Sequence, residues 1–433
     1  MGRVYIKTFG CQMNVYDSER IASVFRNLGY ELTNTPENAD YAIINTCSVR
    51  EKPQHKVDSE LGRLKKFDNL KIGVCGCVAQ QEGMKFLDNY DYVDFVFGTD
   101  AISSLFDIYD MVENGQRVCN VNFNEDKLSI PVFNREKTIS AFVTIMKGCD
   151  NFCSYCIVPY VRGREKSRDS NEIIYEIENL TNQGVKEITL LGQNVNSYRD
   201  NGKKCFAKLL RKIDELHSEG LSRLRFTAAH PQDFTDDVID ALAEMKTSCP
   251  YIHLPAQHGS NEVLRAMERN YTVEHFEEII RKIREKIPNA TISTDIIVGF
   301  PGETEEQFQE LLDFGKRVGF DFSFTAIYSP RKHTAAGEMT DKFIPEKIKK
   351  ERFHRFDEVV KESSWKNREK AIGKTLEVLV EKSVPQEDGL FRHSGRSREF
   401  FEVYFTSGRN LVGQEVPVKI TSRAGYVLNG ELV

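Results

Sequence analysis

The sequence lacks any long hydrophobic run. Although 40% of its 433 residues are hydrophobic, no stretch approaches the ~18 consecutive apolar residues that a membrane-spanning helix requires. This absence excludes a helical membrane protein. The first seven residues, MGRVYIK, also lack the apolar core of a signal peptide, and Ile6 stands where a myristoylation motif has Ser or Thr. We therefore expect a cytoplasmic protein without membrane contact.

A strong excess of either charge is missing too. The chain has 59 Lys and Arg against 65 Asp and Glu, and this net charge of -6 argues against a protein that coats nucleic acid non-specifically. Residues 331–433 differ from the whole, with 20 basic and 16 acidic residues. This local surplus suits both an RNA-contacting surface and an ordinary solvated one.

The first 124 residues alternate short apolar runs with helical patterns. The pattern predicts a helix over Asp17–Leu28 and buried strands over Val4–Phe9, Tyr41–Asn45, Lys71–Cys75 and Val93–Phe97. Strands that alternate with helices form a parallel sheet, so we predict a Rossmann-like domain over residues 1–124. Ligands of such sheets bind just beyond the carboxyl ends of the strands.

A polar stretch, residues 125–137, is predicted to be a linker to a second domain over residues 138–368. That domain has a predicted helix over Asn171–Leu180, with Ser170 as its N-cap. Its six candidate strands are Ala141–Met146, Glu187–Leu191, Ser222–Thr227, Tyr251–Leu254, Ile292–Val298 and Phe320–Tyr328. Six strand–helix units predict a partial (β/α)6 barrel of the TIM type.

The pattern changes again after a charged helix that is predicted from Pro345 to about Lys370. The segments Thr375–Glu381, Phe400–Phe405 and Glu415–Ile420 are short, rich in β-forming residues and separated by turn residues. Residues 370–433 are therefore predicted to form a small antiparallel β-barrel, which makes the chain a multidomain α/β protein.

Three closely spaced cysteines, Cys149, Cys153 and Cys156, follow the first strand of the second domain. Three thiolates would hold three irons of a four-iron cubane and leave the fourth iron open to a non-protein ligand. The alternative is a structural zinc ion with a fourth ligand from elsewhere. Barrel enzymes place their chemistry at the carboxyl ends of the strands, which favours the open cluster.

This Cys-x3-Cys-x2-Cys spacing, with an aromatic residue before the last cysteine, resembles the signature of radical S-adenosylmethionine (SAM) enzymes. The resemblance implies that the open iron chelates SAM and that a 5′-deoxyadenosyl radical then removes hydrogen from the substrate. It also implies that Tyr155 lies near the adenine and that Gly192 and Gln193 receive the amino group of SAM. The run that begins at Gly299, GFPGE, resembles a later SAM-binding segment, although such runs are more often tight turns between a strand and a helix.

Three further cysteines, Cys11, Cys47 and Cys77, each lie just after a predicted strand of the first domain. The carboxyl ends of parallel strands share one edge of the sheet, so these thiols could converge there and hold a second cluster. The alternative is that they are buried as small hydrophobic residues. Cys75 lies close enough to Cys77 to compete with it as a ligand, whereas Cys119, Cys205 and Cys249 match no motif and are interpreted as structural.

The motifs around the first-domain cysteines, TFGCQMN, NTCSVRE and GCVAQ, are similar to the cluster-binding motifs of the methylthiotransferases. Two more stretches, GQNVNSY from Gly192 and HLPAQHGS from His253, resemble the branch of that family that modifies tRNA. The resemblance spans essentially the whole chain. It implies an N-terminal methylthiotransferase domain whose [4Fe–4S] cluster is held by Cys11, Cys47 and Cys77, a radical SAM core with the other [4Fe–4S] cluster, and a C-terminal TRAM domain that binds RNA.

The same resemblance implies methylthiolation of C2 of N6-isopentenyladenosine at position 37, in the anticodon loop of tRNA. It also implies a reductant such as flavodoxin or ferredoxin and a monomeric enzyme, but it leaves the sulfur donor unknown. An aromatic C2–H has no acidic proton for a side-chain base to remove, so radical chemistry suits this reaction. The alternatives are methylthiolation of threonylcarbamoyladenosine or of an aspartate in ribosomal protein S12, or a non-catalytic, metal-containing RNA-binding protein.

Basic residues stand beside aromatic residues in the C-terminal barrel. Arg392, Arg396 and Arg398 precede Phe400, Phe401, Tyr404 and Phe405. Guanidinium groups pair with phosphates and aromatic rings stack on unpaired bases, which makes the three arginines candidates for RNA contact. Alternating aromatic residues in a strand more often pack in a core, and this is the favoured interpretation for the rings.

Overall fold

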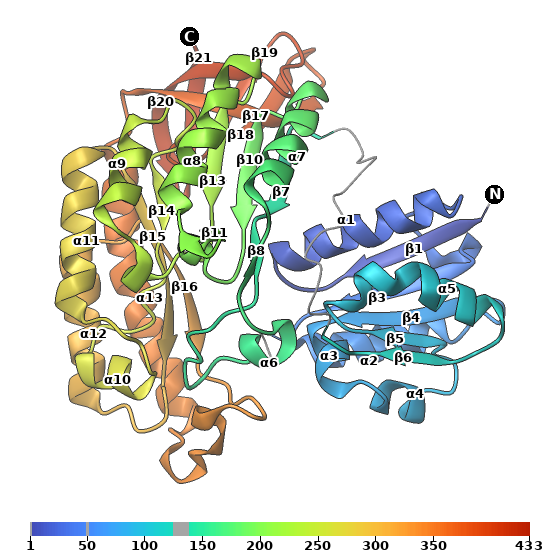
Figure 1. Ribbon diagram of the computed structural model, residues 1–433. Coiled ribbons are helices and arrows are strands. Elements are labelled where there is room, and N and C mark those ends of the chain that lie inside the picture. Colours follow the sequence, from blue (N-terminus) through green and yellow to red (C-terminus); the bar gives the residue numbers. More distant parts are fainter. Residues whose placement is uncertain (1, 49–51, 124–137) are drawn as a thin grey trace.

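The computed structural model describes residues 2–48, 52–123 and 138–433, which form three units in chain order (Figure 1). An N-terminal unit is built on a parallel sheet, a central unit forms an open barrel, and a C-terminal unit is a closed barrel. The linker predicted over residues 125–137 lies outside the described residues.

The N-terminal unit contains six parallel strands in the order β2-β1-β3-β4-β5-β6. Their bounds are β1 Arg3–Thr8, β2 Glu31–Thr33, β3 Tyr41–Thr46, β4 Lys71–Gly76, β5 Phe95–Phe97 and β6 Val118–Asn120. The helices are α1 Gln12–Asn27, α2 Lys52–Leu64, α3 Cys77–Glu82, α4 Lys85–Asn89 and α5 Leu105–Glu113, and a hydrophobic core lies on each face of the sheet. This arrangement confirms the predicted Rossmann-like sheet. The strand order reverses between β1 and β3, and open parallel sheets bind their ligands at such a switch point.

Helix α1 begins at Gln12, five residues before the predicted start at Asp17, so that prediction was wrong. Cys11 is its N-cap residue, and the Cys11 carbonyl accepts hydrogen bonds from the amides of Asn14 and Val15. The first turn of α1 does not continue the helical spacing of hydrophobic residues that face the N-terminal core. Its Met13 and Tyr16 pack instead against Leu191 of the central unit.

The central unit contains two three-stranded parallel sheets, β7-β10-β13 and β14-β15-β16, with helices on their outer faces (Figure 1). The strands are β7 Ser140–Thr144, β10 Glu187–Leu191, β13 Arg223–Phe226, β14 Tyr251–His253, β15 Thr291–Val298 and β16 Phe322–Ile327. The main helices are α7 Ser170–Asn182, α8 Phe206–Asp214, α9 Asp236–Glu244, α11 Val273–Lys286, α12 Glu305–Val318 and α13 Glu346–Glu369. One large hydrophobic core joins both sheets to these helices, which confirms the predicted partial barrel.

Helix α7 has a different N-cap from the predicted Ser170. The Asp169 carboxylate accepts hydrogen bonds from the amides of Asn171 (2.8 Å) and Glu172 (3.4 Å), whereas Ser170 is already helical. The prediction was therefore wrong by one residue, because two good capping residues stand side by side and sequence does not distinguish them.

The C-terminal unit is a closed five-stranded barrel, the fold expected of a TRAM domain. Its strands are β17 Thr375–Pro385, β18 Phe391–Ser397, β19 Glu402–Ser407, β20 Glu415–Ala424 and β21 Val427–Leu432. All strand pairs are antiparallel except β19 and β21, which are parallel and close the barrel. The predicted strand Phe400–Phe405 begins only at Glu402, because Phe400 has a left-handed φ of 71°.

The C-terminal barrel covers the amino ends of the central strands. The guanidinium of Arg223 at the start of β13 is fully buried, pairs with the Glu415 carboxylate, and donates to the carbonyls of Arg396 (2.7 Å) and Glu377 (3.0 Å). Thr291 at the start of β15 donates to the carbonyl of Glu399 (2.7 Å). The carboxyl ends of the strands, where the cysteines lie, therefore stay free of this barrel (Figure 1).

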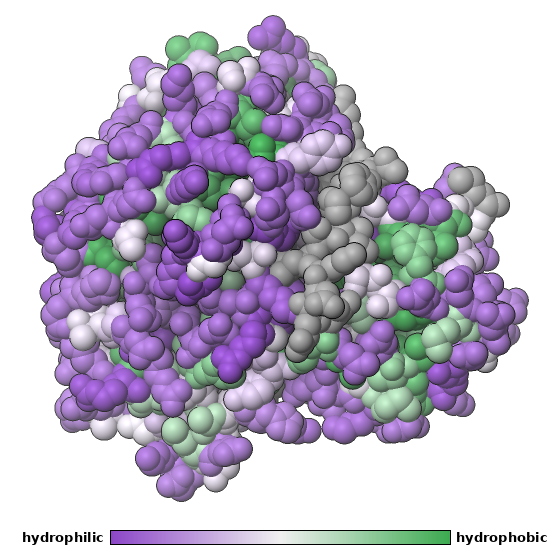
Figure 2. Space-filling view, in the orientation of Figure 1, coloured by the Kyte–Doolittle hydropathy of each residue, from purple (hydrophilic) through white to green (hydrophobic). Residues whose placement is uncertain are grey.

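The molecular face in Figure 2 is mostly hydrophilic, with hydrophobic areas over the N-terminal unit. None of the described helices is long and apolar enough to cross a membrane.

Candidate active site: two cysteine triads

The first cysteine triad lies at the switch point of the N-terminal sheet. Cys11 follows β1, Cys47 follows β3, and Cys77 follows β4 as the first residue of α3. The Cys11 thiol is hydrogen-bonded with Cys47, and Cys77 is close enough to Cys11 to feel its charge. All three are free thiols. The fold thus brings together three cysteines that span 66 positions of the chain, from Cys11 to Cys77.

Two glycines make the close approach of these loops possible. Gly10 has a φ of 131°, and a Cβ atom there would lie 2.4 Å from the Cβ atom of Cys47. Gly76 has a φ of 89°, and a Cβ atom there would lie 2.3 Å from the carbonyl oxygen of Thr46. A side chain at either position would push the cysteine loops apart, so both glycines are part of the site.

Asn14 connects the cysteine loops by hydrogen bonds. Its amide nitrogen donates to Oδ1 of Asn45 (2.8 Å) and to the carbonyl of Thr46 (2.7 Å). The Cys11 thiol donates to Oδ1 of Asn14 (3.4 Å). Because Asn14 is fully buried, these bonds fix the position of Cys11 relative to Cys47.

Arg162 places a buried positive charge against this triad. It ends α6, residues Val158–Arg162, in the central unit, and it is 5% exposed. Its Nη2 atom lies 3.0 Å from Oδ2 of Asp17, and its guanidinium also hydrogen-bonds to the Cys77 thiol. Despite its burial, the charges of Cys77, Asp17 and Cys11 raise the pKa of Arg162, so the guanidinium stays charged.

The hydrogen bond with Cys47, helped by the charge of Arg162, lowers the pKa of Cys11 to about 6. Burial raises the pKa of Cys77. Cys75 is different in position: it is 2% exposed and packs in the hydrophobic core with Val4 and Phe95. The structure therefore places Cys77, and not Cys75, beside Cys11.

The second triad lies on the loop between β8, residues Met146–Lys147, and α6. Cys149, Cys153 and Cys156 are close enough to interact electrostatically. Burial raises the pKa of Cys149 to about 11 and that of Cys156 to about 12. Nη1 of Arg269 lies 3.5 Å from Sγ of Cys153, so a buried guanidinium accompanies this triad as well.

The predicted SAM-contact residues adjoin this loop. The amide of Gly148 donates to Oε1 of Gln193, and a Cβ atom at Gly192 would lie 2.6 Å from Sδ of Met146. Tyr155 packs against a small buried cluster that includes Phe300 and Tyr328. Gln193 and Gly192 thus adjoin the cysteine loop, and Tyr155 lies within it.

Gly299 lies in a turn that is explained by packing. The fully buried Glu303 carboxylate accepts hydrogen bonds from the amides of Gly299 (2.8 Å) and Phe300 (3.2 Å), and Nη1 of Arg352 lies 2.8 Å from it. A Cβ atom at Gly299 would lie 2.4 Å from the Lys349 side chain of α13. These contacts account for the GFPGE run as a tight turn, and a SAM contact at Gly299 stays a prediction.

Helix α6 connects the two triads. It begins two residues after Cys156, its Val161 packs with Ile157 against Cys77, and its last residue is Arg162. The carbonyl of Val161 also accepts a hydrogen bond from Thr99 of the N-terminal unit (2.8 Å). A five-residue helix therefore links the loop of the second cysteine triad to Cys77 of the first triad.

Each triad offers the three protein thiols that a four-iron cluster with one open iron requires. Within residues 2–48, 52–123 and 138–433, no three Cys, His, Asp or Glu side chains meet closely enough to share one ion. A cubane offers each thiolate a different iron, so its ligands stand farther apart than the ligands of one zinc ion. Free thiols beside buried guanidinium groups suit the anionic thiolates of such a cluster.

The three candidate RNA-binding arginines have different surroundings. Arg398 donates to the carbonyls of Ser222 (3.0 Å), Lys246 and Ser248 (both 3.3 Å), so it joins the C-terminal barrel to the central unit. Arg396 stacks on Phe400 at 4.7 Å. Arg392 is exposed and stacks on Tyr404 at 5.0 Å, which leaves its guanidinium accessible from outside.

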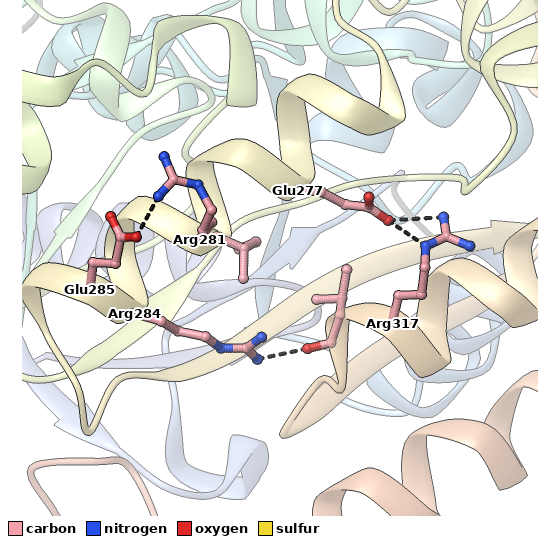
Figure 3. A pocket seen from close by; sticks show the side chains of 7 residues that line it. Glu277, Arg281, Arg284, Glu285 and Arg317 are labelled. Atoms are coloured by element: carbon pink, nitrogen blue, oxygen red, sulfur yellow. Dashed lines mark hydrogen bonds and ion pairs between the residues drawn. The ribbon is translucent and has the colours of Figure 1, made fainter.

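A groove of about 400 Å³ is lined by residues of α11 and α12, none of them a cysteine (Figure 3). Its charged groups are paired with one another: Arg317 with Glu277, and Arg281 with Glu285. Arg284 donates to the carbonyl of Val318 (2.7 Å). Because these groups satisfy each other on a solvated face, the groove has no features of a reaction site.

Arg162 and Arg269 belong to the site but were missed in the sequence. Arg162 pairs with Asp17, 145 positions earlier, and Arg269 approaches Cys153 from 116 positions later. A buried arginine looks like a surface arginine when only its neighbours in the chain are visible. The one local signal is that Arg162 stands six residues after the cysteine motif.

The pKa differences predict a large difference in thiol reactivity in cluster-free protein. At pH 7, Cys11 with a pKa of about 6 is mostly thiolate, whereas Cys149 with a pKa of about 11 is almost entirely thiol. We expect iodoacetamide to label Cys11 first, with a rate that levels off above pH 7, while labelling of Cys149 and Cys156 keeps rising beyond pH 9. Peptide mass spectrometry after anaerobic labelling measures this order, and equal rates at all three positions would contradict it.

Comparisons with known proteins agree with this architecture. The profile of the Radical SAM superfamily matches residues 143–315, and that of the Uncharacterized protein family UPF0004 matches residues 3–98. The fold resembles a solved radical S-adenosylmethionine methyltransferase, TsrM from Kitasatospora setae, with a TM-score of 0.61 over 78% of this chain and 75% of that chain at 15% identity. The open barrel and its three-cysteine loop thus define a radical SAM protein.

Curated relatives specify the family. The chain is 46% identical over 441 residues to the tRNA-2-methylthio-N(6)-dimethylallyladenosine synthase of Carboxydothermus hydrogenoformans, covering 99% of both proteins. It is 45% identical over 440 residues to the enzyme of the same name from Clostridium botulinum, covering 99% of this chain and 95% of that protein. The chain belongs to the tRNA-2-methylthio-N(6)-dimethylallyladenosine synthase family.

Proposed function

We propose that this protein is a tRNA methylthiotransferase that converts N6-isopentenyladenosine at position 37 to its 2-methylthio derivative. The observation that carries the proposal is the pair of cysteine triads joined by α6, one in each of the two units that the family profiles match. Relatives that align over nearly the whole chain are named for this reaction. The position of the base and the tRNA loop come from the family resemblance.

The reaction replaces an aromatic C–H bond, which side-chain acids and bases do not activate. Two [4Fe–4S] clusters and SAM, when bound, supply electron transfer to SAM, hydrogen removal from C2 and a methylated sulfur for that carbon. We assign Cys149, Cys153 and Cys156 to the cluster that binds SAM, and Cys11, Cys47 and Cys77 to the cluster that handles sulfur.

The protein's own part is to hold and orient these groups. Gln193 and Gly192 adjoin the cysteine loop where the amino group of SAM is expected. Tyr155 is assigned to the adenine by resemblance. Gly299 is assigned to the SAM site by resemblance alone. Arg162 and Arg269 place positive charge beside anionic thiolates in water-poor surroundings, where such pairing is strong.

RNA must bring an unstacked base to this site. An anticodon-loop nucleotide leaves its stack at lower cost than a paired one, so tRNA fits the site as substrate. Arg392 and Arg396 are proposed to contact the RNA backbone, and Arg398 to do so while it also holds the barrel in place. We further propose a monomeric enzyme that takes electrons from flavodoxin or ferredoxin.

Mass spectrometry of tRNA nucleosides tests this function. In a strain that lacks the protein, we expect isopentenyladenosine to accumulate and its 2-methylthio form to disappear. The intact gene should restore the 2-methylthio nucleoside, whereas a Cys153→Ala gene should not. Unchanged tRNA in the deletion strain would contradict the substrate assignment, and ribosomal protein S12 would be the next sample to analyse.

A further inference from the structure

The inner face of the β14-β15-β16 sheet carries an unusual set of side chains. In the parallel register, Ser293 pairs with Phe322 and Asp295 with Phe324. Ile292 and Ile296, the alternate residues of β15, lie in the hydrophobic core beneath the helices. Because side chains alternate along a strand, Asp295 and Phe324 face the interior of the open barrel, toward the opposite sheet.

This inner face is open where barrel interiors are normally filled by side chains. Phe324 is 47% exposed, Phe322 is 37% exposed, and the Asp295 side chain is 39% exposed. The two phenylalanine rings meet edge to face with centroids 4.8 Å apart, and His253 contacts Phe324 at 5.7 Å. Two apolar rings and a carboxylate therefore form a surface that the described part of the chain leaves uncovered.

Hydrogen bonds hold the neighbourhood of the carboxylate in place. The Ser293 hydroxyl donates to the Tyr251 hydroxyl (2.8 Å), so it accepts from Nδ1 of His253 at 2.9 Å. Nε2 of His253 lies 3.6 Å from Oδ2 of Asp295, too far for a good hydrogen bond. The carboxylate thus stands beside a fixed imidazole and keeps acceptor capacity for a ligand.

The surface connects the cysteine loop with the RNA-binding barrel. Ile297, two residues beyond Asp295 on the same face of β15, packs against the small hydrophobic cluster that Tyr155 of the cysteine loop also contacts. Two residues along a strand span about 6.6 Å, so Asp295 lies one such step from Ile297. At the other end, the Phe322 ring is 6.4 Å from the ring of Tyr426, which lies between β20 and β21 of the C-terminal barrel and is 39% exposed.

We propose that this surface, made of Phe324, Phe322 and Asp295, is the binding site that recognises the N6-dimethylallyl group of the target adenine. This inference rests on the proposed function. The hydrocarbon substituent would cover the two rings, and the N6–H group would donate to the Asp295 carboxylate. C2 is separated from C6 by N1 alone, so a base held at N6 keeps C2 free to face the cysteine loop. Both alternative targets, threonylcarbamoyladenosine and an aspartate side chain, carry a carboxylate that Asp295 would repel.

The test compares two RNAs with the full-length, cluster-loaded enzyme. Anticodon stem-loops that carry N6-dimethylallyladenosine or plain adenosine at position 37 are titrated, and kcat/KM for methylthiolation is measured. We expect Phe324→Ala to weaken binding of the dimethylallyl RNA about tenfold, since hydrophobic pockets discriminate by such factors, and to leave binding of the plain RNA unchanged. Phe324→Leu, which keeps an apolar contact, should restore most of the preference.

The matched control is Phe106→Ala, which removes a 41% exposed phenylalanine from α5 in the N-terminal unit and should leave both affinities unchanged. SAM cleavage without RNA should be the same in all variants, which excludes general misfolding. Asp295→Asn should weaken binding of the dimethylallyl RNA and strengthen binding of an RNA that carries threonylcarbamoyladenosine. If Phe324→Ala weakened binding of both test RNAs equally, or changed the binding of neither, the proposed binding site would be wrong. If the wild-type enzyme bound the dimethylallyl RNA preferentially but never methylthiolated it, the proposed function would be refuted, whereas the proposed binding site would stand.

Discussion

Replacing Cys149, Cys153 or Cys156 by Ala is expected to abolish SAM cleavage. Under the proposed assignment, each cysteine is one of three protein ligands on a single loop, and that loop contains no fourth cysteine to replace it. Loss of a residue that only supports a metal ligand costs about 10–100-fold, and loss of a ligand should exceed 100-fold. Anaerobic assay of 5′-deoxyadenosine with a chemical reductant measures this effect.

The matching changes in the first triad should behave differently. Cys11→Ala, Cys47→Ala and Cys77→Ala are expected to leave 5′-deoxyadenosine formation in place and to stop methylthiolation of RNA. Cys249→Ala removes a buried cysteine outside both triads and should affect neither reaction. Equal loss of SAM cleavage in the two triads would contradict the division of labour between them.

Replacing Arg162 by Ala is expected to damage both stability and the first cluster. The guanidinium pairs with buried Asp17 and hydrogen-bonds to Cys77, so its removal leaves an under-compensated buried carboxylate. Breaking such a pair costs about 3 kcal/mol in unfolding free energy, and loss of a supporting partner costs about 10–100-fold in metal affinity. Urea unfolding and iron analysis measure the two effects.

The control for this variant is Arg164→Ala, two residues further along, where a 70% exposed side chain pairs with Asp150 at the surface. A surface ion pair contributes roughly 0–1 kcal/mol, so this change should leave stability and iron content nearly unchanged. In Arg162→Ala, we expect iron content to fall toward about half, with SAM cleavage retained. Full iron content with normal stability in that variant would show that the buried pair is dispensable.

Local patterns in the sequence predicted most of the fold. Apolar runs such as Tyr41–Asn45 and Lys71–Cys75 identified the strands of the N-terminal sheet, because strands buried on both faces are hydrophobic throughout. The pattern failed where a segment packs against a different unit. The first turn of α1 buries Met13 and Tyr16 against Leu191, so its hydrophobic residues do not follow the spacing of those that face the core of the N-terminal unit. Strand β18, with sequence FRHSGRS, has no apolar alternation and was missed altogether.

By itself the sequence determined the thiol chemistry, because the spacing of Cys149, Cys153 and Cys156 is a local property of one loop. It also determined the fold class, because the periodicity of hydrophobic residues is local as well. Only the tertiary structure decided which groups accompany those thiols. Arg162 meets Asp17 and Cys77, and Asp295 faces Phe324 on the inner surface of the barrel, through contacts between strands and between units. Burial and charge pairing depend on residues that are distant in the chain, and a linear pattern does not contain those distances.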